Sequence, residues 1–231
     1  MKAEKTLAAG LFSGGKESVH AIFTVENQGV KVEHLLHEIP SFTSPHAHNI
    51  QALRRLAQSM NRNLLIVDLH KGEQELVDSL RSLNVDALVA GDINVPQHVT
   101  WLQNVCLQAG LKLLEPLYGK KTSILFQEMF SEPRFKATII AVNTRYLSDK
   151  WLGFTISRET AEAFLSETRH IDPLGENGEF HTIVVDSPLY SNAFKIKPLA
   201  KLIDQDTAYL RVTLNSISGE EHKSSPIHCC R

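Results

Sequence analysis

The chain has 231 residues, with 24 basic and 26 acidic side chains, a net charge of −2 and 42% hydrophobic residues. The near-neutral charge and the lack of a basic run argue against nucleic-acid binding through phosphates. No apolar run approaches the length of about 18 residues that a membrane span needs. Three cysteines without a C-x-x-C pair do not form a disulfide framework, so we expect a cytoplasmic protein.

The first half of the chain alternates short apolar runs with segments of helical periodicity. Runs that are apolar throughout are typical of parallel strands, which are buried on both faces. Strands that alternate with helices predict βαβ units and a Rossmann-like, doubly wound parallel sheet in an α/β protein. The expected strands are 7–12, 30–36, 64–67 and 87–90, and the expected helices are 16–27, 50–60, 76–83 and 99–109.

The pattern changes after about residue 115. A buried strand at 137–142, a helix at 158–168 and a strand at 183–185 are expected, with a Gly- and Pro-rich loop at 172–182. Later segments alternate apolar and polar residues, which is typical of antiparallel strands. We predict a smaller C-terminal α+β part and divide the chain into segments 1–115, 116–216 and a flexible tail at 217–231.

Residues 13–18 (Ser-Gly-Gly-Lys-Glu-Ser) join the first expected strand to the first expected helix. Adjacent glycines let the backbone approach a ligand closely. The N–H groups at the start of a helix attract an anion such as phosphate. Lys16 adds a positive charge, and Ser13 and Ser18 add hydroxyl groups. This loop therefore predicts a site for the phosphates of a nucleotide.

Two phosphate-binding motifs compete for this segment. Residues 10–16 follow the P-loop pattern, but Glu17 stands where that motif has the Ser or Thr that holds magnesium. The pyrophosphatase loop S-G-G-x-[DE]-S fits at each position, and we favour it. A strand-to-helix turn that uses the glycines only for packing is the third alternative, although such a turn does not need Lys16, Glu17 and two serines.

Further motifs narrow the comparison to one family. Residues 13–18 resemble the loop of PP-loop ATPases, in the adenine nucleotide alpha hydrolase-like superfamily. Residues 151–153 (Trp-Leu-Gly), 175–182 (Gly-Glu-Asn-Gly-Glu-Phe-His-Thr) and 186–190 (Asp-Ser-Pro-Leu-Tyr) resemble the diphthine–ammonia ligase family, and the second of these motifs is most similar to its bacterial branch. The resemblance extends over residues 5–197.

The resemblance implies a division of labour and a reaction. Segment 1–115 would be an ATP-binding PP-loop domain, and segment 116–216 would bind the substrate. A substrate carboxylate would attack the α-phosphorus of ATP, and pyrophosphate would leave. Ammonia would then displace AMP from the acyl-adenylate and leave an amide. In that family the carboxylate belongs to a modified histidine of translation elongation factor 2, whereas the bacterial branch would act on another carboxylate.

The resemblance also implies a nucleotide site. Lys16 would act catalytically by stabilising the departing pyrophosphate. Glu17 and Asp92 would hold Mg²⁺ through carboxylate oxygens, although Asp92 could equally cap a turn. Glu17 replaces the aspartate that is usual in the family. The expected ATP-binding residues are Ser13, Gly14, Gly15, Lys16, Glu17, Ser18, His46, Gly91 and Asp92.

The acidic loop at 175–182 is the second expected site. Glu176 and Glu179 are the expected catalytic carboxylates, because one of them could take a proton from ammonium. The alternative is a solvated turn that carries glutamates for solubility. The expected substrate-binding residues are Gly175, Glu176, Asn177, Gly178, Glu179, His181 and Thr182.

Three functions remain open from the sequence. The leading hypothesis is an ATP-dependent amide ligase that uses ATP, Mg²⁺, ammonia and a carboxylate substrate. A regulatory protein that binds ATP or AMP without turnover and an ATP pyrophosphatase are the alternatives. An unpaired strand edge in the C-terminal part could also pair with a second copy, which would give a homodimer.

Overall fold

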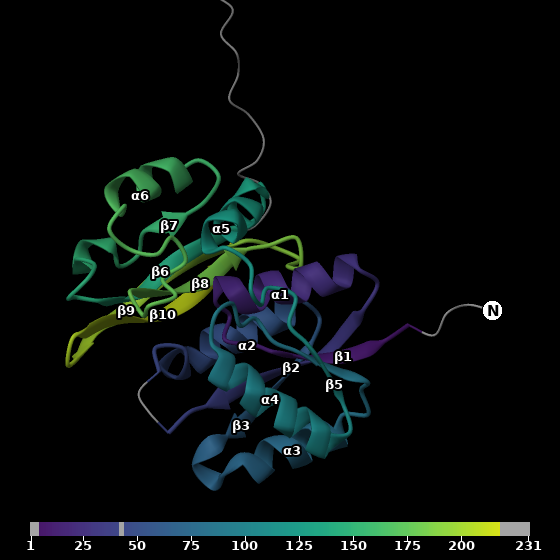
Figure 1. The fold of residues 1–231 in the computed structure, drawn as a ribbon. Helices are drawn as coiled ribbons and strands as arrows, with labels where there is room; N and C mark the ends of the chain where they lie inside the picture. The colour runs from purple at the N-terminus through teal and green to yellow at the C-terminus, as the bar shows by residue number, and fades with distance from the viewer. Residues whose placement is uncertain (1–4, 42–43, 218–231) are drawn as a thin grey trace, which may run out of the picture.

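The computed structural model describes residues 5–41 and 44–217. Figure 1 shows two layered parts packed side by side, one around each of two sheets. No helix within the described ranges is long and apolar enough to cross a membrane. The tail expected at 217–231 lies outside these ranges except for Ile217.

Five strands of the first half pair in parallel. The innermost segments are apolar, as expected for strands that are covered on both faces. The strands are β1 (Leu7–Leu11), β2 (Lys31–Ile39), β3 (Asn63–Asp68), β4 (Ala87–Val89) and β5 (Lys112–Leu114).

The strand order is β3-β2-β1-β4-β5. The chain therefore winds outward from β1 in one direction and resumes from β4 on the other side. In such sheets, ligands bind beyond the carboxyl ends of the two strands at this switch point. The loop at residues 12–15 follows β1, and Gly91 follows β4, so both lie where a ligand is expected.

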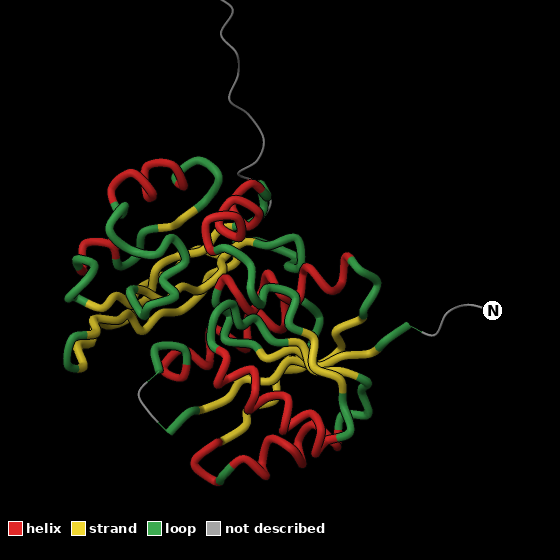
Figure 2. Tube along the Cα trace, viewed as in Figure 1, coloured by secondary structure: helices red, strands yellow, loops and turns green. Residues whose placement is uncertain are grey.

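Helices cover both faces of the parallel sheet (Figure 2). Apolar side chains of the first two helices join one buried cluster, and those of the third and fourth join another on the opposite face. The doubly wound fold predicted from the sequence is confirmed. The helices are α1 (Lys16–Asn27), α2 (Ile50–Ser59), α3 (Glu73–Ser82) and α4 (Pro96–Ala109).

The second half forms an antiparallel sheet with two helices. A long hairpin makes its last two strands, and three short 3-10 helices complete the described chain. The elements of this half are α5 (Thr122–Ser131), β6 (Lys136–Asn143), η3 (Asp149–Trp151), β7 (Thr155–Ile156), α6 (Ala161–Glu167), β8 (Phe180–Asp186), β9 (Phe194–Asp204) and β10 (Thr207–Ser216). The other two 3-10 helices, η1 (Ala47–Asn49) and η2 (Leu69–Lys71), belong to the first half.

The strand order of this second sheet is β7-β6-β10-β9, and β8 also pairs with β6. Helix α6 is shorter than the helix expected at 158–168, because the Thr160 hydroxyl accepts the N–H of Ser157 and holds these residues in a turn. Strand β8 begins earlier than expected, at Phe180. It therefore includes the end of the segment that was expected to be a loop.

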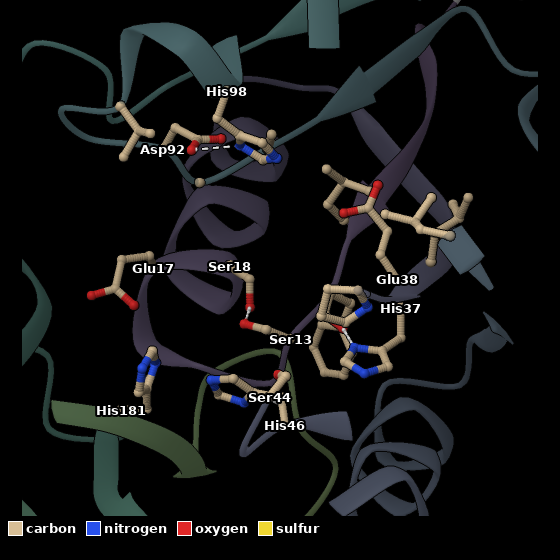
Figure 3. Close-up of a pocket in the computed structure, with 18 of the residues that line it drawn as sticks. Ser13, Glu17, Ser18, His37, Glu38, Ser44, His46, Asp92, His98 and His181 are labelled. Carbon is tan, nitrogen blue, oxygen red and sulfur yellow. Dashed lines mark hydrogen bonds and ion pairs between the residues drawn. The ribbon is translucent and has the colours of Figure 1, made fainter. Parts of the chain in front are cut away.

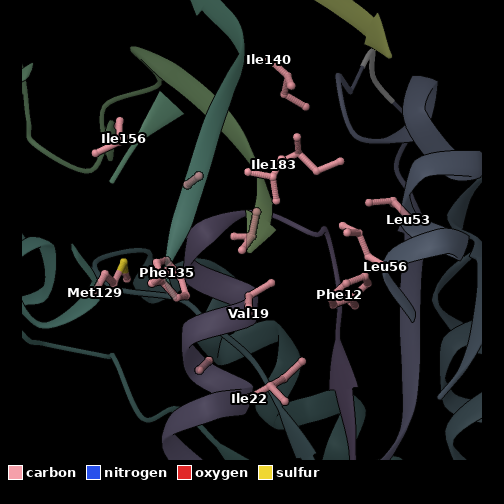
Figure 4. Packing of buried hydrophobic residues seen from close by; sticks show 14 of the residues in the cluster. Phe12, Val19, Ile22, Leu53, Leu56, Met129, Phe135, Ile140, Ile156 and Ile183 are labelled. Atoms are coloured by element: carbon pink, nitrogen blue, oxygen red, sulfur yellow. The ribbon is translucent and has the colours of Figure 1, made fainter. Parts of the chain in front are cut away.

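One apolar cluster joins the two parts. Val19 and Ile22 of α1 and Leu53 of α2 share this cluster with Phe135 and with Ile183 of β8 (Figure 4). All five side chains are almost fully buried. Because α1 and β8 begin beside the two expected site loops, their shared core fixes these loops against each other.

A cavity where two loops meet

The loop after β1 has the conformation expected of an anion site. Gly14 has a φ of +70°, which favours glycine, and Gly15 is the N-cap of α1. The Ser13 hydroxyl accepts the N–H of Gly15 at 3.2 Å. The first turn of α1 leaves N–H groups without partners inside the helix, and its positive end favours an anion.

Gly91 lets the end of β4 lie directly against this helix start. A Cβ atom at this position would lie 2.9 Å from the carbonyl carbon and oxygen of Glu17 and 3.1 Å from the N of Ser18. Because these are backbone atoms, a side chain at position 91 would displace the first turn of α1. Glycine is therefore required for the close approach.

The acidic loop and β8 meet the loop after β1 directly. The N–H of Lys16 donates to the Thr182 hydroxyl at 3.3 Å, and the N–H of Val184 donates to the Gly14 carbonyl at 2.8 Å. These bonds link residues that lie more than 160 positions apart in the chain. The end of the second loop singled out in the sequence thus lies directly against the first.

The Lys16 side chain is buried, with 2% of its surface exposed. Its ammonium lies 2.6 Å from Oε1 of Glu17 and 4.6 Å from the centre of the Phe180 ring. A carboxylate and an aromatic face both stabilise a cation away from water. The side chain therefore rests between the glycine loop and the beginning of β8.

A cavity of about 650 Å³ opens beside these loops (Figure 3). Its size is ordinary for a small-molecule site. It is not lined by Gly14, Gly15, Lys16, Thr182 or the residues of the 175–179 turn. The expected site residues that line it are Ser13, Glu17, Ser18, His46, Gly91, Asp92 and His181.

Two imidazoles form one end of the cavity. The rings of His46 and His181 meet edge to face, with their centres 5.6 Å apart. Burial lowers the pKa of His46, partial loss of water contact lowers that of the exposed His181, and the neighbouring Lys16 charge lowers both further. Both rings are therefore mainly neutral at pH 7. A neutral imidazole can donate or accept a hydrogen bond, but it does not attract phosphate as a fixed positive charge would.

The two glutamates of the acidic loop have different environments. Burial raises the pKa of Glu176 to about 7, and the nearby charge of Glu17 adds to this effect. Burial also acts on Glu179, but hydrogen bonds outweigh it and leave its pKa below the ordinary value. The Glu179 carboxylate accepts the N–H of Asp172 at 3.1 Å, the N–H of Asn177 at 2.9 Å and the Asn177 amide at 3.1 Å.

Asp92 does not cap a helix through its carboxylate. Its Oδ1 lies 2.8 Å from Nδ1 of His98, in the first turn of α4, and this contact raises the pKa of His98. Within the described ranges, no group of three His, Cys, Asp or Glu side chains is arranged to hold a metal ion. The expected magnesium ligands Glu17 and Asp92 nevertheless both face the cavity.

The sequence analysis did not single out three side chains that face or flank this region. Glu38 and His98 line the cavity. Glu115 lies close enough to Asp92 for the charge of Asp92 to raise its own pKa. Burial raises the pKa of Glu38 and of Glu115 to about 7. Glu38 and Glu115 stand at the ends of β2 and β5, where side chains of a parallel sheet reach toward a ligand. This position in the sequence was the signal that could have identified the two glutamates.

Comparison with known protein families agrees with this arrangement. The model of the diphthamide synthase N-terminal domain matches residues 5–113, and that of the diphthamide synthase C-terminal domain matches residues 121–216. The chain belongs to the diphthamide synthase family. The family resemblance inferred from residues 13–18 and 175–182 is therefore confirmed.

Two curated relatives of this diphthamide synthase family member are named diphthine–ammonia ligase. The chain is 28% identical to the diphthine–ammonia ligase of Schizosaccharomyces pombe, over 88% of this chain and 38% of that protein. It is 28% identical to the diphthine–ammonia ligase of Rattus norvegicus, over 55% of this chain and 52% of that protein. The chain thus spans about half or less of the length of these relatives.

Proposed function

We propose that this chain is an ATP-dependent amide ligase that activates a carboxylate as its adenylate and transfers ammonia to it. The observation that carries the proposal is the contact of the glycine loop at 13–18 with Thr182, at the end of the acidic loop, beside one cavity. Glu176 of that loop is close enough to Glu17 and Lys16 for their charges to act on its pKa. The N–H groups of the glycine loop suit the phosphates of ATP, and the carboxyl groups of the acidic loop suit an amine. The name of the curated relatives supports the same reaction.

In this proposal segment 1–115 binds ATP. The phosphates lie on the N–H groups of residues 14–18, where the first turn of α1 has its positive end. His46 contacts the phosphates or the ribose, and Gly91 keeps the end of β4 close to them. Lys16 then leaves Glu17 to stabilise the negative charge that builds on pyrophosphate.

Segment 116–216 brings the acceptor. The carboxylate oxygen of the substrate attacks the α-phosphorus, and the bond to pyrophosphate breaks. Ammonia then attacks the acyl carbon, and AMP leaves. Glu176 is the base that takes the proton from ammonium, because its pKa of about 7 matches that task at neutral pH.

Glu179 holds the acidic loop in shape in this mechanism. Three donors from residues 172 and 177 already occupy its carboxylate, so it positions Glu176 rather than exchanging protons. Gly175 and Gly178, which have φ values of +73° and +82°, permit the tight turn. His181 orients the substrate at the end of the cavity, and Thr182 holds the N–H of Lys16 next to it.

Magnesium completes the proposed site. Glu17 and Asp92 are the carboxylates that would bind it together with the phosphates of ATP, since Mg²⁺ prefers oxygen ligands and uses few protein groups beside a nucleotide. We propose a carboxylate substrate as a class, and the relatives' name makes diphthine one of the candidates to be tested. A cytoplasmic location and a homodimer stay predictions.

Exchange of labelled pyrophosphate into ATP tests this function on the full chain. Exchange that requires an added carboxylic acid, followed by amide formation when ammonium is supplied, supports the ligase. ATP cleavage to AMP and pyrophosphate that ignores the acid supports the pyrophosphatase instead. Tight binding of ATP or AMP without exchange, across a panel that includes diphthine, would favour the regulatory alternative.

A further inference from the structure

Glu38 stands opposite the phosphate-binding side of the cavity. It belongs to the carboxyl-terminal end of β2, and Figure 3 shows its carboxyl group reaching into the cavity across from Glu17 and His181. Its Oε1 is buried and has no hydrogen-bond partner among residues 5–41 and 44–217. A buried acceptor without a partner costs free energy, so a ligand donor at this point would stabilise it.

The walls around Glu38 suit a flat, apolar ring. Leu11, Leu36, Leu69 and Trp101 line the same cavity on neighbouring strands and helices. A nucleotide whose phosphates lie at residues 13–18 would extend its base toward these side chains. Apolar walls with one polar group are the usual arrangement of a site that orients a ring.

The charged groups around Glu38 come from several elements. His98 and Asp92 lie across the cavity, and their charges have opposite effects on its pKa, which burial raises to about 7. At neutral pH, therefore, the Glu38 carboxyl is protonated in a large fraction of molecules and offers both an acceptor and a donor.

We propose that Glu38 selects the base of the bound nucleotide by pairing its carboxyl group with the amino edge of adenine. Adenine carries an exocyclic N–H donor next to a ring nitrogen acceptor, and a protonated carboxyl group matches both. A purine without the 6-amino group offers only the ring nitrogen, so the hydrogen bond that the Glu38 carbonyl oxygen accepts from the amine is lost. This inference rests on the proposed binding of ATP.

Binding measurements on the full chain test the assignment. The ligands are ATP and purine riboside triphosphate, which lacks the 6-amino group. The unmodified chain should bind ATP about tenfold more tightly, which is what one hydrogen bond to a buried group is worth. Glu38→Leu should bring the ratio of the two dissociation constants close to one. Glu38→Gln should preserve it, because an amide also offers one acceptor and one donor.

Glu33→Gln is the matched control, since Glu33 lies on the same strand and pairs with Lys31 at the surface. A Glu38→Leu protein that still prefers ATP about tenfold overturns the inference. Equal affinity of the unmodified chain for the two triphosphates overturns it as well and leaves the proposed function intact. Failure of the unmodified chain to bind either triphosphate overturns both.

Discussion

Two glutamates three positions apart illustrate how local environment assigns a role. Glu176 is half-buried near the charges of Glu17 and Asp172, so its pKa is raised. Glu179 is 3% exposed, yet its carboxylate is saturated by donors of its own loop. One carboxyl group is free to exchange a proton near pH 7, and the other stabilises the loop that presents it.

Replacing the base should separate the two half-reactions. We expect Glu176→Gln to retain exchange of pyrophosphate into ATP and to lower amide formation about 10²- to 10⁴-fold, the usual contribution of a general base. Product amide and exchange are measured on the same sample. Glu162→Gln, an exposed position on α6, is the control. Amide formation at the unmodified rate would exclude Glu176 as the base.

Glu179→Ala should act through stability. The substitution leaves the N–H groups of Asp172 and Asn177 without their acceptor, and each lost bond to a charged group is worth about 1.5–3 kcal/mol. Urea unfolding should show a loss of this order for Glu179→Ala and almost none for Glu176→Gln. Equal stability of the two variants would contradict the separation of roles.

Gly15 should tolerate no branched side chain. A Cβ atom there would lie 3.1 Å from the Ser13 hydroxyl and 3.4 Å from the His46 ring, and the methyl groups of valine extend further. We expect Gly15→Val to abolish ATP binding, as measured by calorimetry. Gly29→Ala is a control with a positive φ and no atom within 4 Å of its Cβ. Retained affinity in Gly15→Val would refute our placement of the phosphates.

Among the elements, α1 connects the cavity to the core. Its first residues form the floor of the expected phosphate site, and Val19 and Ile22 anchor it in the cluster shared by the two sheets. Its start is also in close contact with the end of β4 at Gly91. A shift of this helix would therefore alter the site without exposing the core.

Gly91→Ala tests this coupling. The added Cβ would meet the Glu17 carbonyl at 2.9 Å, and backbone cannot rotate away as a side chain would. We expect the first turn of α1 to move and ATP affinity to fall at least about tenfold, since such overpacking costs roughly 1–3 kcal/mol. Circular dichroism should remain unchanged. Unaltered affinity would show that the helix start has room to adjust.

Across the whole molecule, one buried cluster joins the parallel and antiparallel sheets, so the two parts should unfold together. Several histidines lie inside this structure. Burial lowers the pKa of His20 to about 4 from 6.5, and its ring packs edge to face on Phe135. The unfolded chain therefore binds a proton at His20 more readily than the folded one.

This difference gives stability a pH dependence with a definite sign. The contribution of neutral His20 is fully present above pH 6.5 and is lost as the pH falls toward 4. It amounts to at most about 3 kcal/mol. His20→Leu should remove that part of the acid sensitivity, as measured by urea unfolding from pH 7 to 4. Parallel pH profiles of the two proteins would contradict the assignment.

The sequence predicted the elements with strong apolar patterns. The helix expected at 16–27 coincides with α1, and the first four expected strands correspond to β1–β4. The sequence analysis did not predict β5, which has three residues, or α5, whose apolar residues do not form one narrow face. It also did not single out Glu38 and Glu115, because a glutamate at a strand end has no local pattern that marks it as buried.

The sequence by itself determined the parallel sheet, the glycine loop and the acidic loop, because each depends on neighbouring residues whose spacing is local. Only the tertiary structure decided that Thr182 contacts Lys16, that Glu179 is occupied while Glu176 is free, and that Glu38 faces the same cavity. These relations depend on burial and on contacts between distant segments. Burial also changes the pKa of a carboxyl group, so the chemistry of each glutamate follows from the packing around it.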